Sequence, residues 1–448
     1  MTPVLSQSFS SSSASITNPT APSLTRELSN SSIQSLADLL ISSSTSQLAE
    51  ASGQEVVREE GLRHAKVKLD ARHYKKSTFT LQLLEIVHKL RIPVWSTASP
   101  SADDIIIQRV SGALTNAVFF VSCPTLPFAR TLLLRVYGSS SGSLISRTRE
   151  LHILHVLSSV YKIGPRVYGT FENGRIEEYF DSVTLTASDI RDPQISRWIG
   201  ARMAELHSVD VDVVDSSPEV PGGVEIVTNV KSWLKFAKKV LKLPGISGDI
   251  RHELDLGRFR KEWEAYVTWA LKRQHTLGTK RVFAHNDAQY GNLLRLKNDI
   301  EGVDEHRQII VVDFEYAAPN PAAFDIANHF HEWTANYHSS TPHILTPALY
   351  PSLEERRNFY SSYIRHSSML AEDPSFDEDA LDGVIDELDR DVKIWGAASH
   401  AGWAIWGIIQ AREDLEAELE QPEFDYIGYA RGRMAAFRKA LQDLDISM

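Results

Sequence analysis

The sequence contains little cysteine and no long apolar segment. Its 448 residues include a single cysteine, Cys123, so no intrachain disulfide can form and a Cys/His zinc cluster has no material. A lone thiol is typical of a reducing compartment, and we expect the protein to be cytoplasmic. The richest apolar run, around residues 404–409, is far shorter than the roughly 20 residues that cross a bilayer. We therefore expect no integral membrane contact.

Positive charge is also scarce. Lysine and arginine number 47 against 58 aspartates and glutamates, which gives a formal net charge of −11. Nucleic acids and anionic membrane surfaces attract basic proteins, so neither is expected as the main partner. What is present, 42% hydrophobic and 23% charged residues, is the composition of an ordinary globular protein, long enough for one large two-lobed domain.

The first 53 residues lack what a packed core requires. They are rich in serine and threonine and poor in charge, so we expect residues 1–53 to form a disordered tail. A mitochondrial transit peptide is the alternative, but such peptides need several arginines and this tail has one. Within it, Ile33, Leu36, Leu39 and Leu40 have the spacing of a short docking helix.

The next part of the chain alternates strands with a few helices. A helix is expected over residues 78–90, where Leu81, Leu84, Val87 and Leu90 recur at three-residue steps. A second, charged helical stretch is expected over residues 146–160. Five β-like runs accompany them, at 105–110, 117–121, 132–136, 166–171 and 175–180.

Beyond residue 181 the pattern is helical, interrupted by one pair of β-like runs, 282–284 and 309–312. A β-rich segment followed by a helical one predicts an α+β protein with two lobes. We expect a small β-rich N-terminal lobe over residues 54–180 and a large, mainly helical C-terminal lobe over residues 181–448. The helices expected in the large lobe are 194–207, 227–241, 251–274, 353–365 and 377–418.

Two short motifs carry the chemistry, and each follows one of those β-like runs. They read VFAHNDAQYGNLL at 282–294 and IIVVDFEY at 309–316. Phosphoryl transfer needs a carboxylate that orients the attacking hydroxyl group and oxygen ligands that hold Mg²⁺ on the phosphates. Asp287, Asn292 and Asp313 would supply these parts. The structural alternative is a turn capped by Asp287 and Asn292, with Asp313 in a strand-end salt bridge.

These motifs resemble the choline/ethanolamine kinase family, which has a protein-kinase-like fold. The family's phosphotransfer signature is similar to His285–Asn292, and its second signature is similar to VVDFEYAAPNPAAFDIANHFHEW at 311–333. The resemblance extends from about residue 105 to the C-terminus. It implies a two-lobed ATP-dependent small-molecule kinase that needs Mg²⁺ and transfers the γ-phosphoryl group of ATP to choline, as the first step of phosphatidylcholine synthesis from free choline.

The resemblance also implies roles for residues in both lobes. Asp287 would be the catalytic base, Asn292 and Asp313 the magnesium ligands, and Glu315 a neighbour of the metal. His285 would hold the loop. The residues expected to bind the nucleotide are Ser111, Gly112, Leu114, Thr115 and Asn116 in a phosphate-facing hairpin, Arg135 at the phosphates with Glu150 as its candidate ion-pair partner, and Glu178, Tyr179 and Phe180 at the adenine.

Aromatic residues near the C-terminus indicate how a substrate is held. Trp403 and Trp406 lie on one face of a helix, and such stripes are usually core. A quaternary ammonium cannot donate a hydrogen bond and is best bound by aromatic faces. In the family resemblance the walls of a choline pocket correspond to Tyr316, Tyr337, Trp403, Trp406 and Tyr429, with Gln289 near the hydroxyl group and Glu332 near the cation.

Choline is favoured over ethanolamine by Gln289 and by the Glu-Trp pair at 332–333, where ethanolamine-preferring members more often have Glu-Phe. An ethanolamine kinase or a dual choline/ethanolamine kinase is the first alternative. More distant alternatives are an aminoglycoside-type phosphotransferase, whose pocket would be acidic, and an inactive kinase-like binding protein. Members of the family are commonly dimers, so a homodimer is one assembly to consider, and no residue of the sequence establishes an interface.

Overall fold

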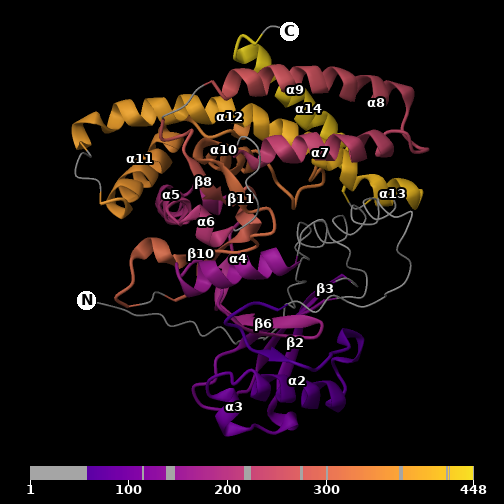
Figure 1. Ribbon diagram of the computed structural model, residues 1–448, viewed down its shortest axis with the longest axis vertical. Helices are drawn as coiled ribbons and strands as arrows, with labels where there is room; N and C mark the ends of the chain where they lie inside the picture. The colour runs from indigo at the N-terminus through magenta and orange to yellow at the C-terminus, as the bar shows by residue number, and fades with distance from the viewer. Residues whose placement is uncertain are drawn as a thin grey trace, which may run out of the picture.

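A computed structural model shows two lobes, one built on a sheet and the other on helices (Figure 1). This is the α+β arrangement that the sequence predicts. It describes residues 58–113, 116–137, 147–215, 223–272, 276–298, 301–372, 377–419, 422 and 424–446. The expected tail at 1–53, with its docking helix, lies outside these residues.

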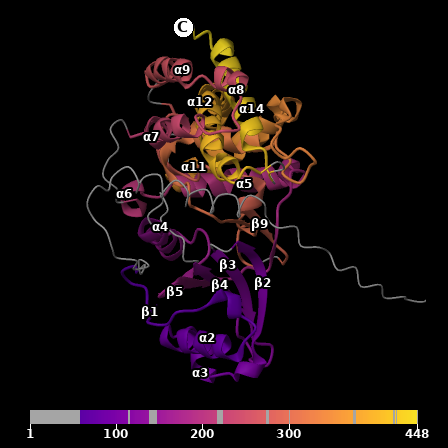
Figure 2. The same cartoon turned by 90° about the vertical axis from the view of Figure 1, so that its right-hand side faces the viewer.

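The small lobe is a six-stranded sheet with the strand order β1-β5-β6-β4-β3-β2. The pairs are antiparallel except β1 with β5, which is parallel. Figure 2 shows α2 and α3 at the end of this lobe farthest from the C-terminus. Its elements are β1 (His64–Ala65), η1 (Ala71–His73), α2 (Ser77–Lys89), α3 (Trp95–Ala98), η2 (Ala102–Asp104), β2 (Ile106–Ala113), β3 (Asn116–Ser122), β4 (Leu132–Tyr137), α4 (Arg147–Ser159), β5 (Val167–Phe171) and β6 (Gly174–Glu178).

Helix α2 forms where predicted and buries Val87 and Leu90 of the predicted stripe, but not Leu81. A three-residue step falls short of a full turn by about 60°, so a stripe at that spacing drifts around the helix. Leu81 is accordingly 57% exposed, while Phe79, Leu83 and Ile86 join Val87 in the core. These four positions follow the true helical period, and Phe79 packs on Phe119 of β3 with ring centroids 5.9 Å apart.

Two hairpins connect neighbouring strands of this sheet. Ala113 pairs with Asn116, so the predicted 111–116 loop is reduced to two connecting residues. In the second hairpin Phe171 pairs with Gly174. A side chain cannot replace this glycine, because a Cβ there would lie 2.2 Å from the carbonyl oxygen of Arg135.

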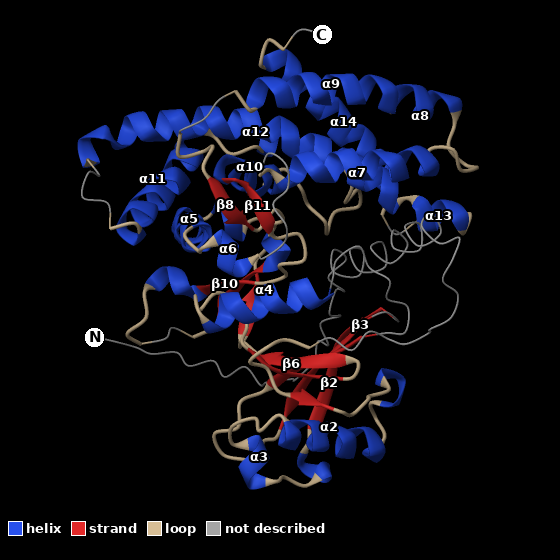
Figure 3. Ribbon diagram, viewed as in Figure 1, coloured by secondary structure: helices blue, strands red, loops and turns tan. Residues whose placement is uncertain are grey.

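The large lobe is a set of helices around small sheets (Figure 3). The expected helix at 251–274 is two helices, because Asp255 caps a new one by accepting hydrogen bonds from the backbone N–H groups of Gly257 and Arg258. The helices are η3 (Asp189–Arg191), α5 (Pro193–His207), α6 (Val211–Val214), α7 (Glu225–Val240), α8 (Gly248–Glu253), α9 (Leu256–Ala270), η4 (Tyr290–Asn292), η5 (Glu305–Gln308), α10 (Ala322–Glu332), η6 (Pro347–Leu349), α11 (Leu353–Leu370), η7 (Glu378–Ala380), α12 (Leu381–Gln410), α13 (Arg412–Glu416) and α14 (Tyr426–Asp443).

The two β-like runs predicted in this lobe form strands but do not pair with each other. Strand β8 (Arg281–Ala284) pairs with β11 (Ala318–Pro321), and β10 (Ile309–Val311) pairs with β9 (Leu293–Leu296), which pairs in turn with β7 (Ser182–Thr184). Strand β11 was not predicted, because two of its four residues are proline, a poor strand former. These two small sheets position both chemical motifs.

The two lobes have separate cores. Phe79, Phe119 and Phe171 belong to the core of the small lobe. Helix α4 departs from this division, since its Leu151 and Leu157 are buried in the larger core of the helical lobe. The lobe boundary at residue 180 stays a prediction. In the described part of the chain, the helices are all too short or too polar to span a membrane.

Candidate active site

One buried carboxylate, Asp325 of α10, holds the loop that carries the first motif. Its two oxygens accept hydrogen bonds from the backbone N–H groups of His285 (2.8 Å) and Asn286 (2.7 Å). His207 at the end of α5 lies 3.0 Å from the same carboxylate. Asn286 has a positive φ of 64°, a conformation that this pair of hydrogen bonds supports. The sequence analysis assigned no role to Asp325, although this residue lies within the second family signature at 311–333.

His285 connects the two motifs. Its Nε2 donates a hydrogen bond to the carbonyl oxygen of Val312 (3.1 Å), and its Nδ1 accepts one from the backbone N–H of Asp287 (3.3 Å). Burial lowers the pKa of this imidazole, which favours the neutral ring that these two bonds require. His285 thus ties Asp287 to the strand that delivers Asp313, as the resemblance implies.

Asp287 and Asn292 face each other across this loop. The Asn292 side chain donates through Nδ2 to Asp287 Oδ2 (2.9 Å) and to the Asp287 carbonyl oxygen (3.0 Å). The pKa of Asp287 is raised well above its usual range, chiefly by burial and then by the negative charges of Glu332, Glu315 and Asp313. A carboxylate in this environment can take up a proton near neutral pH.

The same excess of negative charge fits a bound cation. Asp313 has a positive φ of 69° and lines a cleft together with Asn292. Because Asn292 donates through its nitrogen, its amide oxygen is the atom it can offer to a metal. Carboxylate and amide oxygens are the ligands that Mg²⁺ takes in proteins, so these two residues suit a magnesium ion that is held between protein and phosphates.

A cleft of about 300 Å³ separates the two lobes at this point. It brings together several residues expected at the nucleotide, namely Arg135, Glu178, Tyr179 and Phe180, and joins them to Asn292 and Asp313. Leu114 and Thr115 lie outside the described residues. Ser111, Gly112 and Asn116 lie in β2 and β3 at the hairpin, and their side chains are not described.

The ion pairs in the floor of this cleft differ from those expected. Arg135 lies 3.4 Å from Glu177, and Glu150 pairs instead with Arg175 at 2.9 Å. Arg175 also contacts Glu177 and donates to the Tyr137 hydroxyl group (2.9 Å). It is the more buried of the two arginines, at 2% against 8% exposed. The sequence analysis missed Arg175, because strand register determines which arginine reaches α4.

The predicted aromatic walls come together on the other side of Asp287. Ring centroids are 5.7 Å apart for Tyr316 and Trp403, 5.2 Å for Trp403 and Trp406, and 6.0 Å for Trp406 and Tyr429. The Trp406 indole N–H donates to the Tyr316 hydroxyl group (3.1 Å). Burial first, and then the negative charges of Glu315 and Asp287, raise the pKa of Tyr316, so this aromatic cage lies close to the Asp287 carboxylate.

Tyr337 and Glu332 complete the cage through a residue that the sequence analysis missed. The Tyr337 hydroxyl group donates to Glu332 Oε2 (2.7 Å), and Arg433 of α14 lies 3.2 Å from Glu332 Oε1. Arg433 is fully buried and donates through Nε to the Tyr429 hydroxyl group (3.0 Å). Glu332, expected to face a substrate cation directly, is therefore already paired with a cation of the protein.

Gln289 is the remaining substrate residue predicted from the sequence. Its side chain is 5% exposed, and its buried Oε1 accepts no hydrogen bond from the described residues. A buried acceptor without a donor is costly, so this atom is suited to a ligand that supplies one.

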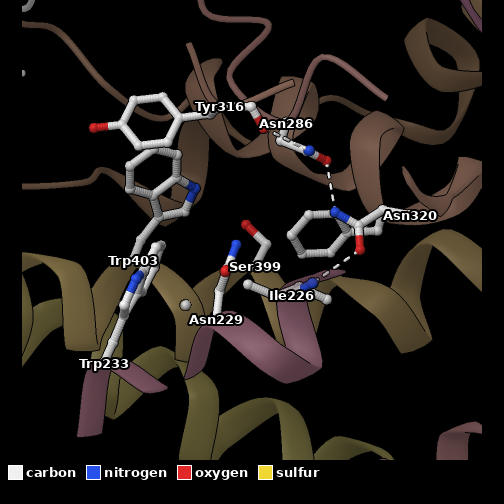
Figure 4. Close-up of a pocket in the computed structure, with 10 residues that line it drawn as sticks. Ile226, Asn229, Trp233, Asn286, Tyr316, Asn320, Ser399 and Trp403 are labelled. Carbon is white, nitrogen blue, oxygen red and sulfur yellow. Dashed lines mark hydrogen bonds between the residues drawn. The ribbon is translucent and has the colours of Figure 1, made fainter. Parts of the chain in front are cut away.

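A smaller cavity of about 40 Å³ lies behind the cage and shares Tyr316 and Trp403 with it (Figure 4). Its far wall is a chain of amides. Asn320 donates to the side-chain oxygen of Asn286 (2.9 Å) and accepts from the backbone N–H of Ile226 (3.0 Å). This chain fixes the catalytic loop to the start of α7.

The chain is similar to known proteins over most of its length. Residues 107–438 match the model of the family described as choline/ethanolamine kinase. A choline kinase of Schizosaccharomyces pombe is 34% identical over 82% of this chain and 90% of its own, and a choline kinase of Saccharomyces cerevisiae is 30% identical over 79% of this chain and 74% of its own. The crystal structure of a choline kinase from Cryptosporidium parvum superimposes with a TM-score of 0.65 and 24% identity, over 82% of this chain and 97% of that one. The family match and the identity to the fission yeast relative show that this chain belongs to the choline/ethanolamine kinase family.

Proposed function

We propose that this protein is a choline kinase, which transfers the γ-phosphoryl group of Mg-ATP to the hydroxyl group of choline and forms phosphocholine and ADP. The observation that carries the proposal is the aromatic cage beside Asp287. Kinase chemistry alone would need only Asp287, Asn292 and Asp313. A cage of Tyr316, Trp403, Trp406 and Tyr429 adds the faces that bind a quaternary ammonium.

In the proposed reaction the hydroxyl oxygen of choline attacks the γ-phosphorus and the bond to the bridging oxygen of ADP breaks. Asp287 orients the hydroxyl group and takes its proton, which the raised pKa of this carboxyl supports. A magnesium ion on Asn292 and Asp313 would neutralise charge on the phosphates. Arg135 lines the same cleft and is suited to the phosphate oxygens, because its guanidinium group stays charged.

Choline rather than ethanolamine fits the way the cage is built. A primary ammonium donates three hydrogen bonds and would need matching acceptors. Glu332, which the cage residue Tyr337 contacts, is already engaged by Arg433 and Tyr337, and the indole groups of Trp403 and Trp406 have no acceptor to offer. The site therefore offers faces more than acceptors. An acidic aminoglycoside pocket is disfavoured for the same reason.

Release of ADP from Mg-ATP tests this proposal when choline, ethanolamine, 3,3-dimethylbutan-1-ol and an aminoglycoside are compared. The third compound has carbon in place of the choline nitrogen. Each cation–π contact contributes about 0.5–2 kcal/mol, so we expect its kcat/KM to be lower than that of choline by about tenfold or more. Ethanolamine should be a poorer, secondary substrate.

Asp287→Asn is the matched control for the chemistry. It should bind ATP with near-normal affinity and lower kcat by about 10²–10⁴-fold, the usual contribution of a general base. Higher kcat/KM for ethanolamine would assign the protein as an ethanolamine kinase with the same machinery. ATP binding without turnover of any of the four compounds would support the inactive binding protein instead.

A further inference from the structure

Three side chains outside the active site converge on one point of the large lobe. Glu205 comes from the last turn of α5, His306 from η5 and His366 from α11. Helices α5 and α11 pack side by side (Figure 1). The potential ligand atoms of these three residues all lie within 4.8 Å of one another.

Both imidazoles direct the same nitrogen at the same oxygen. Nε2 of His306 lies 2.8 Å from Glu205 Oε1, and Nε2 of His366 lies 3.6 Å from it. The two rings are edge to face, with centroids 4.6 Å apart. Nε2 of His366 is buried and makes no hydrogen bond within the described residues. A buried ring nitrogen that makes no hydrogen bond, next to a second imidazole and a carboxylate, is available to bind a cation.

Two arginines also contact the Glu205 carboxylate, and a bound cation would have to compete with them. Arg202 is buried and contacts Oε2 of Glu205, the oxygen that faces away from the histidines. Arg307 lies 3.0 Å from Oε1, and its side chain is 38% exposed. Arg202 can therefore remain in place and orient the carboxylate, while Arg307 can turn into solvent and release Oε1.

We propose that Glu205, His306 and His366 form a binding site for a divalent transition metal ion, with Zn²⁺ as the best match. Two imidazole nitrogens and one carboxylate oxygen are a common zinc ligand set, with water in the fourth position. Magnesium prefers oxygen ligands, so this site would not compete with the active site for its ion.

The location gives the site a structural purpose. Glu205 lies two residues before His207, which contacts Asp325 and so reaches the catalytic loop. His306 lies three residues before β10, the strand that leads to Asp313. A metal ion here would join α5, α11 and the segment before β10, and would stabilise the elements that support both chemical motifs.

Zinc uptake by the full-length, untagged protein tests the proposal, with excess Mg²⁺ present and ATP absent. We expect one Zn²⁺ per chain by isothermal titration calorimetry, a higher Tm, and a visible Co²⁺ absorption band from nitrogen ligation. His306→Gln and His366→Gln should each weaken Zn²⁺ binding by about tenfold or more, as changes at metal sites do. His343→Gln, which changes another half-buried histidine, should leave it unchanged.

Arg307→Ala distinguishes a metal site from an ion-pair network. If the three residues bind metal, removing a competitor of Oε1 should tighten Zn²⁺ binding. If Arg307 and the histidines only pair with Glu205, the variant should lose stability and take up no Zn²⁺. The proposal is overturned by that result, and equally by wild-type Zn²⁺ affinity in both histidine variants. If the histidine variants fail to fold, Zn²⁺ binding by Arg307→Ala still distinguishes a metal site from an ion-pair network.

Discussion

A single buried arginine contacts several side chains of the aromatic cage and its surroundings. Arg433 is 0% exposed and contacts Glu332, Tyr429 and the Nδ1 of His400. Its guanidinium group lies 5.1 Å from the centroid of the Tyr429 ring. An aromatic wall that already faces one cation of the protein is held in a fixed orientation toward the site. Arg433 is thus a positioning residue for the cage.

Arg433→Met should cost both stability and substrate binding. Removing one partner of a buried ion pair typically costs about 3–5 kcal/mol, because the other charge stays buried and unpaired. We expect a loss of this size in denaturant unfolding and a higher KM for choline, with the KM for ATP little changed. Adding Glu332→Gln removes the second charge and should restore part of the stability. A double variant that is destabilised by the sum of both single losses would contradict this coupling.

Residues within short motifs could be predicted from the sequence, whereas long-range partners could not. Asp287, Asn292 and Asp313 lie in two motifs that follow strands. The structure places Asn292 and Asp313 in one cleft, and Asn292 is hydrogen-bonded to Asp287. Arg433 lies 101 residues from Glu332, and nothing in its local sequence identifies that partner. The error over Glu150 has the same origin, since its partner Arg175 is reached through the register of β6 against β4.

At the level of elements, α12 serves two purposes along its 30 residues. Its N-terminal part is core, with Trp395 3% exposed. Further along, Trp403 and Trp406 are only partly buried and face Tyr316. From the sequence alone, such an aromatic stripe could be part of the core or part of a binding surface. Which of the two it becomes depends on the residues that α10 and α14 place opposite the helix.

Substitutions along α12 should separate these two purposes. Trp403→Leu should raise the choline KM by about tenfold, through loss of a cation–π contact, while the KM for ATP and the Tm change little. Trp395→Leu, on the core part of the same helix, should lower the Tm and leave both KM values nearly unchanged. Steady-state kinetics and thermal melts measure both. Equal effects of the two variants on all three quantities would mean that Trp403 is only core.

Element prediction failed where periodicity was weak. Strands β9 and β11 have four residues each, too few to show an alternation, and the prolines of β11 argue against a strand. Both form because neighbouring strands pair with them. Helix α2 was predicted, but its stripe of Leu81, Leu84, Val87 and Leu90 was only partly right, because Phe79 and Ile86 contribute more to the core than Leu81 does.

At the scale of the whole molecule, the order of strands and then helices was sufficient to predict two lobes. It could not show that α4 packs into the core of the other lobe, since that depends on tertiary contacts. Burial lowers the pKa of several histidines of the large lobe, among them His285, His329, His331 and His400. Such groups make the folded state sensitive to acid.

His329 gives this sensitivity its clearest test. It is 0% exposed, donates through Nδ1 to the carbonyl oxygen of Ala288 (2.8 Å) and accepts at Nε2 from the indole N–H of Trp333 (3.3 Å). The bond accepted at Nε2 needs the neutral ring. Burial lowers its pKa to about 4, whereas an unfolded histidine titrates near pH 6.5.

Between pH 6.5 and 4 the unfolded chain therefore binds a proton at His329 that the folded chain does not. The unfolding free energy should fall with decreasing pH in this window, by up to about 1.4 kcal/mol per pH unit for this residue. Asp287 and Glu332, whose pKa values are raised first by burial, take up protons when folded and act in the opposite sense. The pH dependence of the wild type alone therefore does not isolate the contribution of His329.

His329→Asn keeps a donor for the carbonyl oxygen of Ala288 and removes the titrating ring. The difference in unfolding free energy between the wild type and this variant, measured in urea, should be constant above pH 7 and become smaller below pH 6.5. A difference that stays constant down to pH 4 would show that His329 accepts its proton in the folded state as readily as in the unfolded one.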